Sequence, residues 1–281
     1  MTLARAKHAA RSQLRSCAIS LGKTRLGRVV FEQIVNSSMN RTRNVSHAGI
    51  NLVFAVPNSL NTFRAATFST KEPETLAWID AIAVDSVLWD VGANIGLYSC
   101  YAAKARHCRV VAFEPSVFNL ELLARNVFLN HVTERVTIVS LPLFERIAES
   151  TLNMTSMEWG GALSTFGAAH GFDGKVLGKV FEFRTIGLSM DECVTKLGVP
   201  FPDYIKMDVD GIEHLILRGG KEVLRRVRGV SVEINDAFTA QAEESRRVLV
   251  EAGLRFVSKA HSQLIEDNPS FNQTFNQVWV R

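Results

Sequence analysis

The sequence predicts an α/β fold in which helices cover both faces of a mostly parallel sheet. Apolar stretches of strand length alternate with helical patterns from about residue 84 onward, which is the pattern of βαβ units. A glycine-containing turn at residues 90–96 joins the first of these strands to its helix. Ligands of such folds bind at the carboxyl ends of the strands, so we expect the functional site at that edge.

The expected elements follow one another with short connections. Strands are predicted at 50–56, before the turn 90–96, and at 109–114, 136–139, 204–211, 229–235, 254–258 and 277–280; helices are predicted at 74–82, 97–105, from 115–116 onward, and at 189–197, 212–227 and 238–252. Ser189 and Glu192 have the spacing of a capping box. Residues 151–183 contain several glycines and are predicted to be irregular. Trp159 and His170 in this stretch are candidates to line a substrate pocket.

The chain is long enough for one large domain with an extension. We predict a basic N-terminal extension at 1–70, which includes a short strand and helix, and a ligand-binding domain at 71–281. Before residue 46 the only acid is Glu32, against these basic residues: Arg5, Lys7, Arg11, Arg15, Lys23, Arg25, Arg28, Arg41 and Arg43. Such an arm is most simply a solvated or partly disordered leader, but it also suits an anionic membrane surface, a nucleic acid or an acidic partner. Its Arg- and Ser-rich composition is shared by organellar presequences.

The apolar stretches and the cysteines of the sequence argue against a membrane-spanning protein and against a zinc protein. Neither a secretory apolar core nor a run of eighteen apolar residues is present, so no transmembrane helix is predicted. The four cysteines, Cys17, Cys100, Cys108 and Cys193, have no C-x-x-C spacing. We therefore expect no zinc site, and reduced thiols favour a cytoplasmic location.

The turn at 90–96 predicts a nucleoside site. Glycines there permit close approach of a ligand to the backbone, and Glu114 ends the next strand, where a carboxylate can accept hydrogen bonds from ribose hydroxyls. A dinucleotide site would have glycine at the position of Asp90, because a carboxylate repels pyrophosphate. S-adenosylmethionine (SAM) carries an ammonium and a sulfonium instead of phosphate. The sequence therefore favours SAM over NAD.

Charged residues gather at the end of the strand 204–211. Lys206, Asp208 and Asp210 alternate, which places them on one face of a strand, and Glu213 follows. Asp208 is a candidate base or acceptor-orienting group, with Lys206 holding it or the developing alkoxide; Glu233 ends the next strand. A mutual Lys–Asp pair is the structural alternative. A divalent ion on Asp208, Asp210 and Glu213 is a rival to direct base catalysis, and we rank it second.

These motifs strongly resemble those of the FkbM-type methyltransferases. The resemblance rests on Asp90-Val-Gly-Ala-Asn94-Ile-Gly96, on Phe113-Glu114-Pro115 with Asn119 and Asn126, and on the segment 205–213, and it extends from about residue 71 to about residue 235. It implies a class I SAM-dependent methyltransferase fold, with seven strands of which the last is antiparallel. Most members have glutamate at the position of Asp210.

The resemblance also implies an activity, and it adds to the site residues that the turn and the strand ends already indicate. Family members mostly methylate hydroxyl oxygens of sugars, glycolipids or secondary metabolites, so we expect a small-molecule or glycan acceptor and no specific nucleic acid. The expected catalytic residues are Asp208, Lys206 and Glu233, and the expected SAM-binding residues are Asp90, Gly92, Asn94, Gly96, Glu114 and Asn119. The alternatives are a nicotinamide-dependent oxidoreductase, a non-catalytic nucleotide-binding or scaffold protein, and a methyltransferase that acts on nucleic acid.

Overall fold

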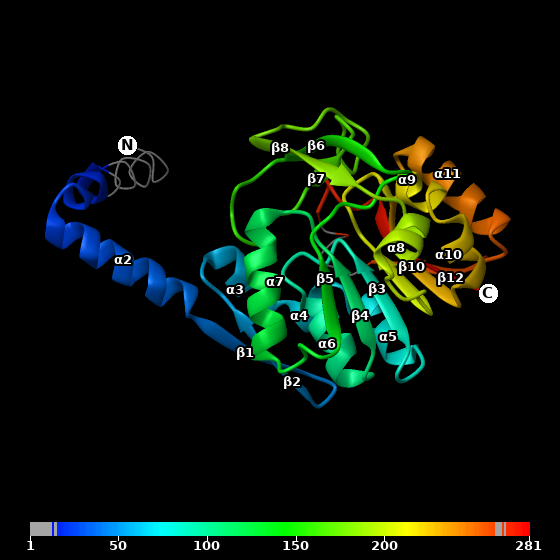
Figure 1. The fold of residues 1–281 in the computed structure, drawn as a ribbon, viewed down its shortest axis with the longest axis horizontal. Helices are drawn as coiled ribbons and strands as arrows, with labels where there is room; N and C mark the ends of the chain where they lie inside the picture. Colours follow the sequence, from blue (N-terminus) through cyan, green and yellow to red (C-terminus); the bar gives the residue numbers. More distant parts are fainter. Residues whose placement is uncertain (1–12, 14–15, 262–265, 267) are drawn as a thin grey trace.

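The computed structural model describes residues 13, 16–261, 266 and 268–281. Its centre is a seven-stranded sheet with the order β11-β12-β10-β9-β3-β4-β5 (Figure 1). Strands β3, β4, β5, β9 and β10 are mutually parallel, and β12 runs antiparallel to both of its neighbours. The predicted class I architecture, with one antiparallel strand at the end of the chain, is confirmed. The strands are β3 (Val87–Val91), β4 (Arg109–Phe113), β5 (Val136–Val139), β9 (Tyr204–Met207), β10 (Gly229–Asn235), β11 (Arg255–Ala260) and β12 (Thr274–Val280).

Apolar side chains lie on both faces of the sheet because most positions of its inner strands are apolar and buried. In β3, Leu88 belongs to one core cluster and Trp89 to the other. Val110 and Val111 divide in the same way in β4, as the two-residue period of a strand requires. Each face therefore needs a cover of helices. The helices are α2 (Arg25–Met39), α3 (Ser59–Ala66), α4 (Phe68–Lys71), α5 (Pro73–Ala81), α6 (Leu97–Ala105), α7 (Val117–Leu129), α8 (Met190–Leu197), α9 (Glu213–Arg218), α10 (Lys221–Arg226) and α11 (Thr239–Glu251).

A hairpin of β1 (Thr42–His47) and β2 (Ile50–Ala55) precedes the sheet. Its Phe54 shares a core cluster with Tyr101 of α6. The Asn126 side chain of α7 accepts a hydrogen bond from the Ala55 N–H at 2.8 Å and donates one to the Ile95 carbonyl at 2.7 Å. The second half of the predicted extension thus packs on the main domain. The boundary at residue 70 stays a prediction.

Helix α2 extends away from the body of the molecule (Figure 1). Only its last residue, Met39, and Gly27 are buried. Met39 lies in a small cluster with Ala55, Ile95 and Leu122, so the helix is attached to the body at its C-terminal end. Within the described ranges, none of the helices combines the length and the hydropathy that crossing a bilayer would require.

The prediction of an irregular stretch at 151–183 was wrong at both of its ends. Strands β6 (Ala148–Met154), β7 (Ser164–Phe166) and β8 (Phe181–Gly187) form a separate antiparallel sheet with the order β7-β6-β8. The signal was the alternation Phe181-Glu-Phe-Arg-Thr-Ile, whose side chains alternate between half-buried and exposed. Glycines at 160, 161, 167, 171, 174 and 178 hid this strand pattern.

The helix predicted at 212–227 is broken into α9 and α10. A Cβ at Gly219 would lie 2.6 Å from the Phe144 carbonyl oxygen, and one at Gly220 would lie 2.1 Å from Met190 Cε. The two glycines let the chain pack closely on α8 and on the loop between β5 and β6, and this contact ends the first helix. The strand predicted at 204–211 also ends early, at Met207. The capping box of Ser189 and Glu192 is confirmed.

Candidate functional site

A cavity of about 430 Å³ lies at the carboxyl ends of the central strands, where the fold was expected to bind its ligand. Of the predicted site residues, Asp90 and Gly96 do not line it. Three further charged residues in its wall, Arg64, Lys71 and Glu72, precede β3. The predicted residues that do line it are Gly92, Asn94, Glu114, Asn119, Lys206, Asp208 and Glu233.

The turn after β3 depends on two glycines with positive φ. Gly92 has a φ of +81°, and a Cβ there would lie 1.8 Å from the Asp208 carbonyl oxygen. Gly96 has a φ of +80°, and its Cβ would lie 2.3 Å from Leu123 Cδ1. Both glycines are therefore required by neighbouring protein atoms. Gly92 brings the turn against the end of β9, where the charged cluster begins.

Asp90 is buried beneath the cavity. Its Oδ2 accepts a hydrogen bond from the Ser99 hydroxyl at 2.6 Å, and its Oδ1 lies 3.7 Å from Lys206 Nζ. Burial raises the pKa of Asp90, and Lys206 opposes that shift. The sequence suggested that Asp90 contacts the cofactor directly. In the structure its side chain points away from the cavity, toward Ser99 and Lys206. Its role as a cofactor residue stays a prediction.

Glu114 lies in the cavity wall and supports the glycine turn. Its Oε2 accepts a hydrogen bond from the Asn94 N–H at 2.8 Å, and its Oε1 accepts one from the Ser116 N–H at 2.7 Å. Each oxygen keeps further acceptor capacity for a ligand hydroxyl. Burial raises the pKa of Glu114 to about 7 despite these hydrogen bonds, so its charge changes near neutral pH.

Residues 159–161, here called the strap, reach the cavity wall at Gly161 and are held by side chains from several elements. The Asn94 and Asn119 amides both donate to the Gly161 carbonyl, at 2.8 and 3.0 Å. Asn119 Oδ1 also accepts from the Gly160 N–H at 3.0 Å, and Arg64 Nε donates to the Gly160 carbonyl at 2.9 Å. The side chains of Asn94 and Asn119 thus fix the strap. Cofactor contact for these two residues stays a prediction.

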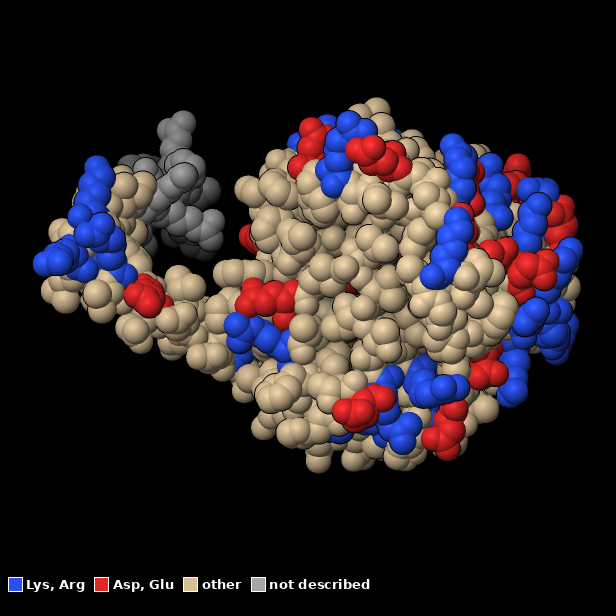
Figure 2. All heavy atoms as spheres, viewed as in Figure 1, with Lys and Arg blue, Asp and Glu red and all other residues tan. Residues whose placement is uncertain are grey.

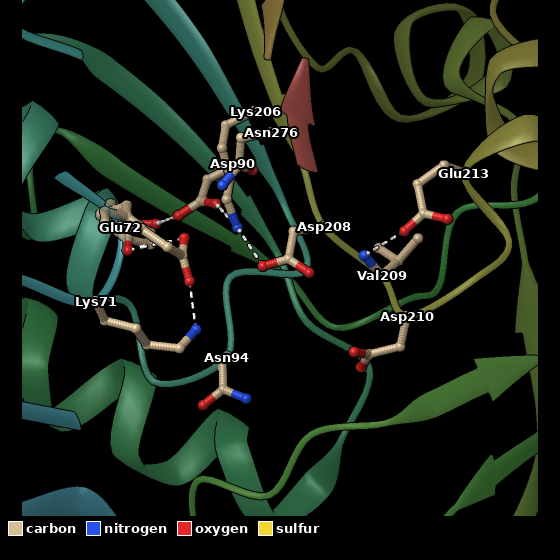
Figure 3. A network of polar contacts seen from close by, with 12 residues as sticks. Lys71, Glu72, Asp90, Asn94, Lys206, Asp208, Val209, Asp210, Glu213 and Asn276 are labelled. Atoms are coloured by element: carbon tan, nitrogen blue, oxygen red, sulfur yellow. Dashed lines mark hydrogen bonds and ion pairs between the residues drawn. The ribbon is translucent and has the colours of Figure 1, made fainter. Parts of the chain in front are cut away.

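Lys206 and Asp208 form the charged centre of the site (Figure 3). Lys206 Nζ lies 3.3 Å from Asp208 Oδ2. Burial alone would lower the pKa of Lys206, but Asp208 and Asp90 raise it overall. Burial likewise opposes ionisation of Asp208, yet Lys206 and Lys71 bring its pKa below the ordinary value. Asp208 is therefore an ionised carboxylate that faces the cavity at neutral pH.

Glu233 and Glu72 add two more carboxyl groups to this side of the cavity. Burial raises the pKa of Glu233 well above its ordinary value, and the nearby charge of Asp208 raises it further. Glu72 pairs with Lys71 and accepts a hydrogen bond from the Tyr98 hydroxyl at 2.9 Å. This side of the cavity therefore combines the carboxyl groups of Glu72, Asp208 and Glu233 with the ammonium groups of Lys71 and Lys206.

The carboxylates of Asp210 and Glu213 are turned to backbone groups. Asp210 Oδ2 accepts from the Leu163 N–H at 2.6 Å, and Glu213 accepts from the Val209 N–H at 3.0 Å. Burial raises the pKa of Asp210 to about 6 and that of Glu213 to about 7. Glu213 does not line the cavity. Glu213 thus lies apart from the cavity that Asp208 and Asp210 line, and among the described residues no cluster of three metal-ligating side chains occurs. The choice between direct base catalysis and a metal ion stays a prediction.

Trp159 and His170 were candidates to line a substrate pocket, but neither residue lines the cavity. The Trp159 carbonyl accepts hydrogen bonds from the Asn58 and Asn61 amides at 3.0 and 2.8 Å, which holds the strap. The His170 ring packs on Phe238 with 5.2 Å between centroids. Both residues serve packing and loop attachment.

Comparison with known proteins agrees with this geometry. The family model described as the methyltransferase FkbM domain matches residues 90–256, which is more than half of the 281-residue chain. The chain belongs to the FkbM methyltransferase family. The match begins at Asp90 and covers the glycine turn, Glu114, the strap and the charged end of β9. It leaves out Arg64, Lys71 and Glu72, which line the same cavity.

Two similar proteins were found, one by its sequence and one by its structure. Hexuronic acid methyltransferase AglP of Haloferax volcanii is 32% identical over 151 residues, covering 54% of this chain and 56% of that protein. The chain thus spans about half the length of this curated relative. The crystal structure of methyltransferase FkbM from Methylobacillus flagellatus KT covers 91% of this chain and 60% of its own, with 13% identity and a TM-score of 0.51. That likeness shows the fold.

Sequence reasoning missed the contribution of the N-terminal elements to this FkbM site. Arg64 belongs to α3, Lys71 ends α4, and Glu72 precedes α5. Their positions follow no motif, and only the packing of α3 and α4 beside the glycine turn brings them to the cavity. The sequence carried one weak signal, the adjacent charges of Lys71 and Glu72 before an apolar helix. Charged side chains close to buried elements must be paired or hydrogen-bonded, so this position was a candidate for a polar site.

Proposed function

We propose that this FkbM-family protein transfers a methyl group from SAM to a hydroxyl oxygen of a sugar or glycan. The observation that carries the proposal is the composition of the single cavity in which the predicted residues meet. The wall contains more acids than bases: Glu72, Glu114, Asp208, Asp210 and Glu233 against Arg64, Lys71 and Lys206.

The acidic wall suits SAM better than a dinucleotide. SAM has a positive sulfonium and an ammonium, whereas the pyrophosphate of NAD would face the excess of carboxylates. The volume of about 430 Å³ is within the usual range of small-molecule sites. In the proposed complex, Glu114 accepts hydrogen bonds from the ribose hydroxyls, and the backbone around Gly92 approaches the methionine end. The family assignment and the fold agree with this cofactor.

When bound, SAM supplies an electrophilic methyl group on a sulfonium. The acceptor oxygen forms a bond to the methyl carbon while the carbon–sulfur bond breaks, and that electron pair stays on sulfur to give S-adenosylhomocysteine. The hydroxyl proton must leave during or after attack. Asp208 is the ionised carboxylate in the wall, so we assign it to orient the hydroxyl and accept this proton. Lys206 keeps Asp208 ionised and stabilises negative charge that develops beside it.

Glu233 has a supporting role in the proposal. Burial and the charge of Asp208 raise its pKa, which favours the protonated form, and a protonated carboxyl can donate a hydrogen bond to the acceptor. Much of the rate enhancement would come from holding the donor and the acceptor in line. Gly161 of the strap and the N-terminal residues Arg64, Lys71 and Glu72 complete the wall in which the two would be held.

A polyhydroxylated acceptor fits the polar side of the cavity. Lys71, Glu72 and Tyr98 provide two charged groups and a phenol there, and these groups can hydrogen bond with neighbouring sugar hydroxyls. The relative from Haloferax volcanii is named for a hexuronic acid, which supports a sugar as the acceptor class. Arg64 and Lys71 give the wall two cations that suit a sugar carboxylate.

The test is methyl transfer from isotopically labelled SAM to a panel of glycosides, with matched 4-nitrophenyl β-D-glucuronide and β-D-glucoside among them, followed by mass spectrometry. The expected result is one labelled methyl ether on at least one glycoside, together with S-adenosylhomocysteine. Transfer to nucleic acid but to no glycoside would overturn the acceptor class. Production of reduced nicotinamide cofactor with no methylated product would overturn the activity itself.

We also propose a cytoplasmic location. Cys100, Cys108 and Cys193 are buried free thiols and Cys17 is an exposed one, which is the usual state of thiols in a reducing compartment. Cell fractionation tests this proposal, and recovery of the protein from an oxidising compartment would contradict it.

A further inference from the structure

Helix α2 has an apolar side that the rest of the described chain leaves exposed. Leu26, Val30 and Ile34 are four residues apart and so lie along one side of the helix. Their exposed fractions are 73%, 39% and 55%. Val29, which adjoins this side of the helix, is also more than half exposed. Contiguous exposed apolar residues of this kind mark an interaction surface.

The helix is well formed without a covering partner. The Thr24 side chain caps its first turn by accepting a hydrogen bond from the Gly27 N–H at 2.9 Å. At the other end, Met39 packs into the body, and the Ser38 hydroxyl donates to the Pro57 carbonyl. The helix is thus held at its C-terminal end and presents the remaining turns away from the domain.

The charge of the same segment is strongly basic. Arg28 and Glu32 lie on another side of α2 from Leu26, and Glu32 is the only acid before residue 46. Figure 2 shows Lys and Arg side chains gathered at the far end of the projecting arm. The basic residues that the structure describes here are Lys23, Arg25, Arg28, Arg41 and Arg43.

We propose that α2 and its flanking residues 23–43 bind the chain to an anionic lipid surface. A helix with an apolar side and a basic polar side lies in the plane of a membrane interface, with the apolar side among the acyl chains and the basic side chains near anionic headgroups. Pairing of two copies of α2 would bring two strongly basic segments together, so charge favours lipid over a second copy of this chain. The inference is independent of the proposed methyl transfer.

Vesicle sedimentation of the full chain tests the proposal. The probes are phosphatidylcholine vesicles and vesicles in which about a third of the lipid is phosphatidylglycerol. The expected result is binding to the anionic vesicles, reduced by more than about tenfold in the L26S/V30S/I34S variant and by about tenfold in R25Q/R28Q. Raised salt should weaken the wild type but have little further effect on R25Q/R28Q.

Matched controls come from α11, where Arg246 and Val250 are exposed and four residues apart. The variants R246Q and V250S should bind vesicles as the wild type does, and all variants should keep the wild-type melting temperature. Equal, weak binding of the wild type to both vesicle types would overturn the proposal. So would a dimer in solution that the triple serine variant converts to a monomer, because the apolar side would then be covered by a second copy.

Discussion

Lys206 Nζ lies 3.3 Å from Asp208 Oδ2 in the wall of the cavity. Beneath it, the same ammonium lies 3.7 Å from Asp90 Oδ1. One buried cation therefore connects the glycine turn after β3 with the carboxyl end of β9. Asp208 lines the cavity and Asp90 does not, so a ligand contacts the carboxylate of Asp208. Substitutions at Asp208 should therefore change turnover, whereas substitutions at Glu114 should change the affinity for SAM.

Replacing Asp208 with asparagine should remove the base and leave the shape of the cavity. We expect Asp208→Asn to keep its SAM affinity and to lose about 10²–10⁴-fold in turnover. Calorimetry and single-turnover methyl transfer measure the two effects separately. Asp173→Asn, an acidic residue paired with Lys175 outside the cavity, is the control. If Asp208→Asn melts at a lower temperature and yet turns over normally, the carboxylate serves only the ion pair.

Replacing Glu114 should weaken the binding of SAM more than it slows the methyl-transfer step. Hydrogen bonds to a charged group contribute about 1.5–3 kcal/mol, so Glu114→Ala should weaken SAM binding by about tenfold or more. An unchanged dissociation constant in a folded variant would show that Glu114 only supports the turn through Asn94 and Ser116.

The pH dependence of SAM binding follows from the same residue. The pKa of Glu114 is raised to about 7 by burial, so its carboxylate is ionised above pH 7 and protonated below it. Because the ionised form is the better acceptor for ribose hydroxyls, SAM affinity should fall as pH decreases from about 8 to about 6. Glu114→Gln, which cannot ionise, should flatten this profile in a calorimetric titration. A profile that is flat in the wild type contradicts the assignment.

Gly92 offers a test of the close contact between the turn and β9. A Cβ at Gly92 would lie 1.8 Å from the Asp208 carbonyl oxygen, whereas nothing lies within 4 Å of one at Gly49, which has nearly the same φ. Gly49→Ala should therefore introduce only backbone strain, which lowers the free energy of unfolding by about 1–2 kcal/mol. Gly92→Ala should lose clearly more, as measured by chemical denaturation. Equal losses would mean that the turn moves freely away from β9.

Asn119 tests the role of the strap. Asn119→Ala removes two hydrogen bonds to residues 160 and 161, so backbone amides of 158–163 should exchange hydrogen faster, and SAM should dissociate faster. Asn51→Ala, a substitution at an exposed asparagine of β2 outside the cavity wall, is a matched control. Unchanged exchange at 158–163 would show that Arg64 and Asn94 hold the strap by themselves.

The central sheet could be predicted from sequence because its signals are local. The apolar strands, the glycine turn and the acid at Glu114 each lie within a few residues, and the antiparallel end of the sheet followed from the family resemblance. The strands of the small sheet were missed because the glycines at 160, 161, 167, 171, 174 and 178 lie between them and made the whole stretch resemble a loop. The break between α9 and α10 was missed because it depends on the close contact of Gly220 with Met190, which lies far away in sequence.

The site could be predicted only in part for the same physical reason. Glu114 and Asp208 were located correctly in the cavity wall by their positions at strand ends. The inward turn of Asp90 toward Lys206, and the use of Glu213 to hold the backbone at Val209, depend on side-chain packing. Lys71 and Glu72 came to the cavity through tertiary contacts of α4 that no periodic pattern encodes.

Isothermal titration calorimetry with SAM, S-adenosylhomocysteine and NAD measures the central claim most directly, namely that this cavity is a SAM site. The account predicts saturable binding of SAM and S-adenosylhomocysteine by the wild type, at least about tenfold weaker binding by Glu114→Ala, and no binding of NAD. Binding of NAD without binding of SAM would contradict it.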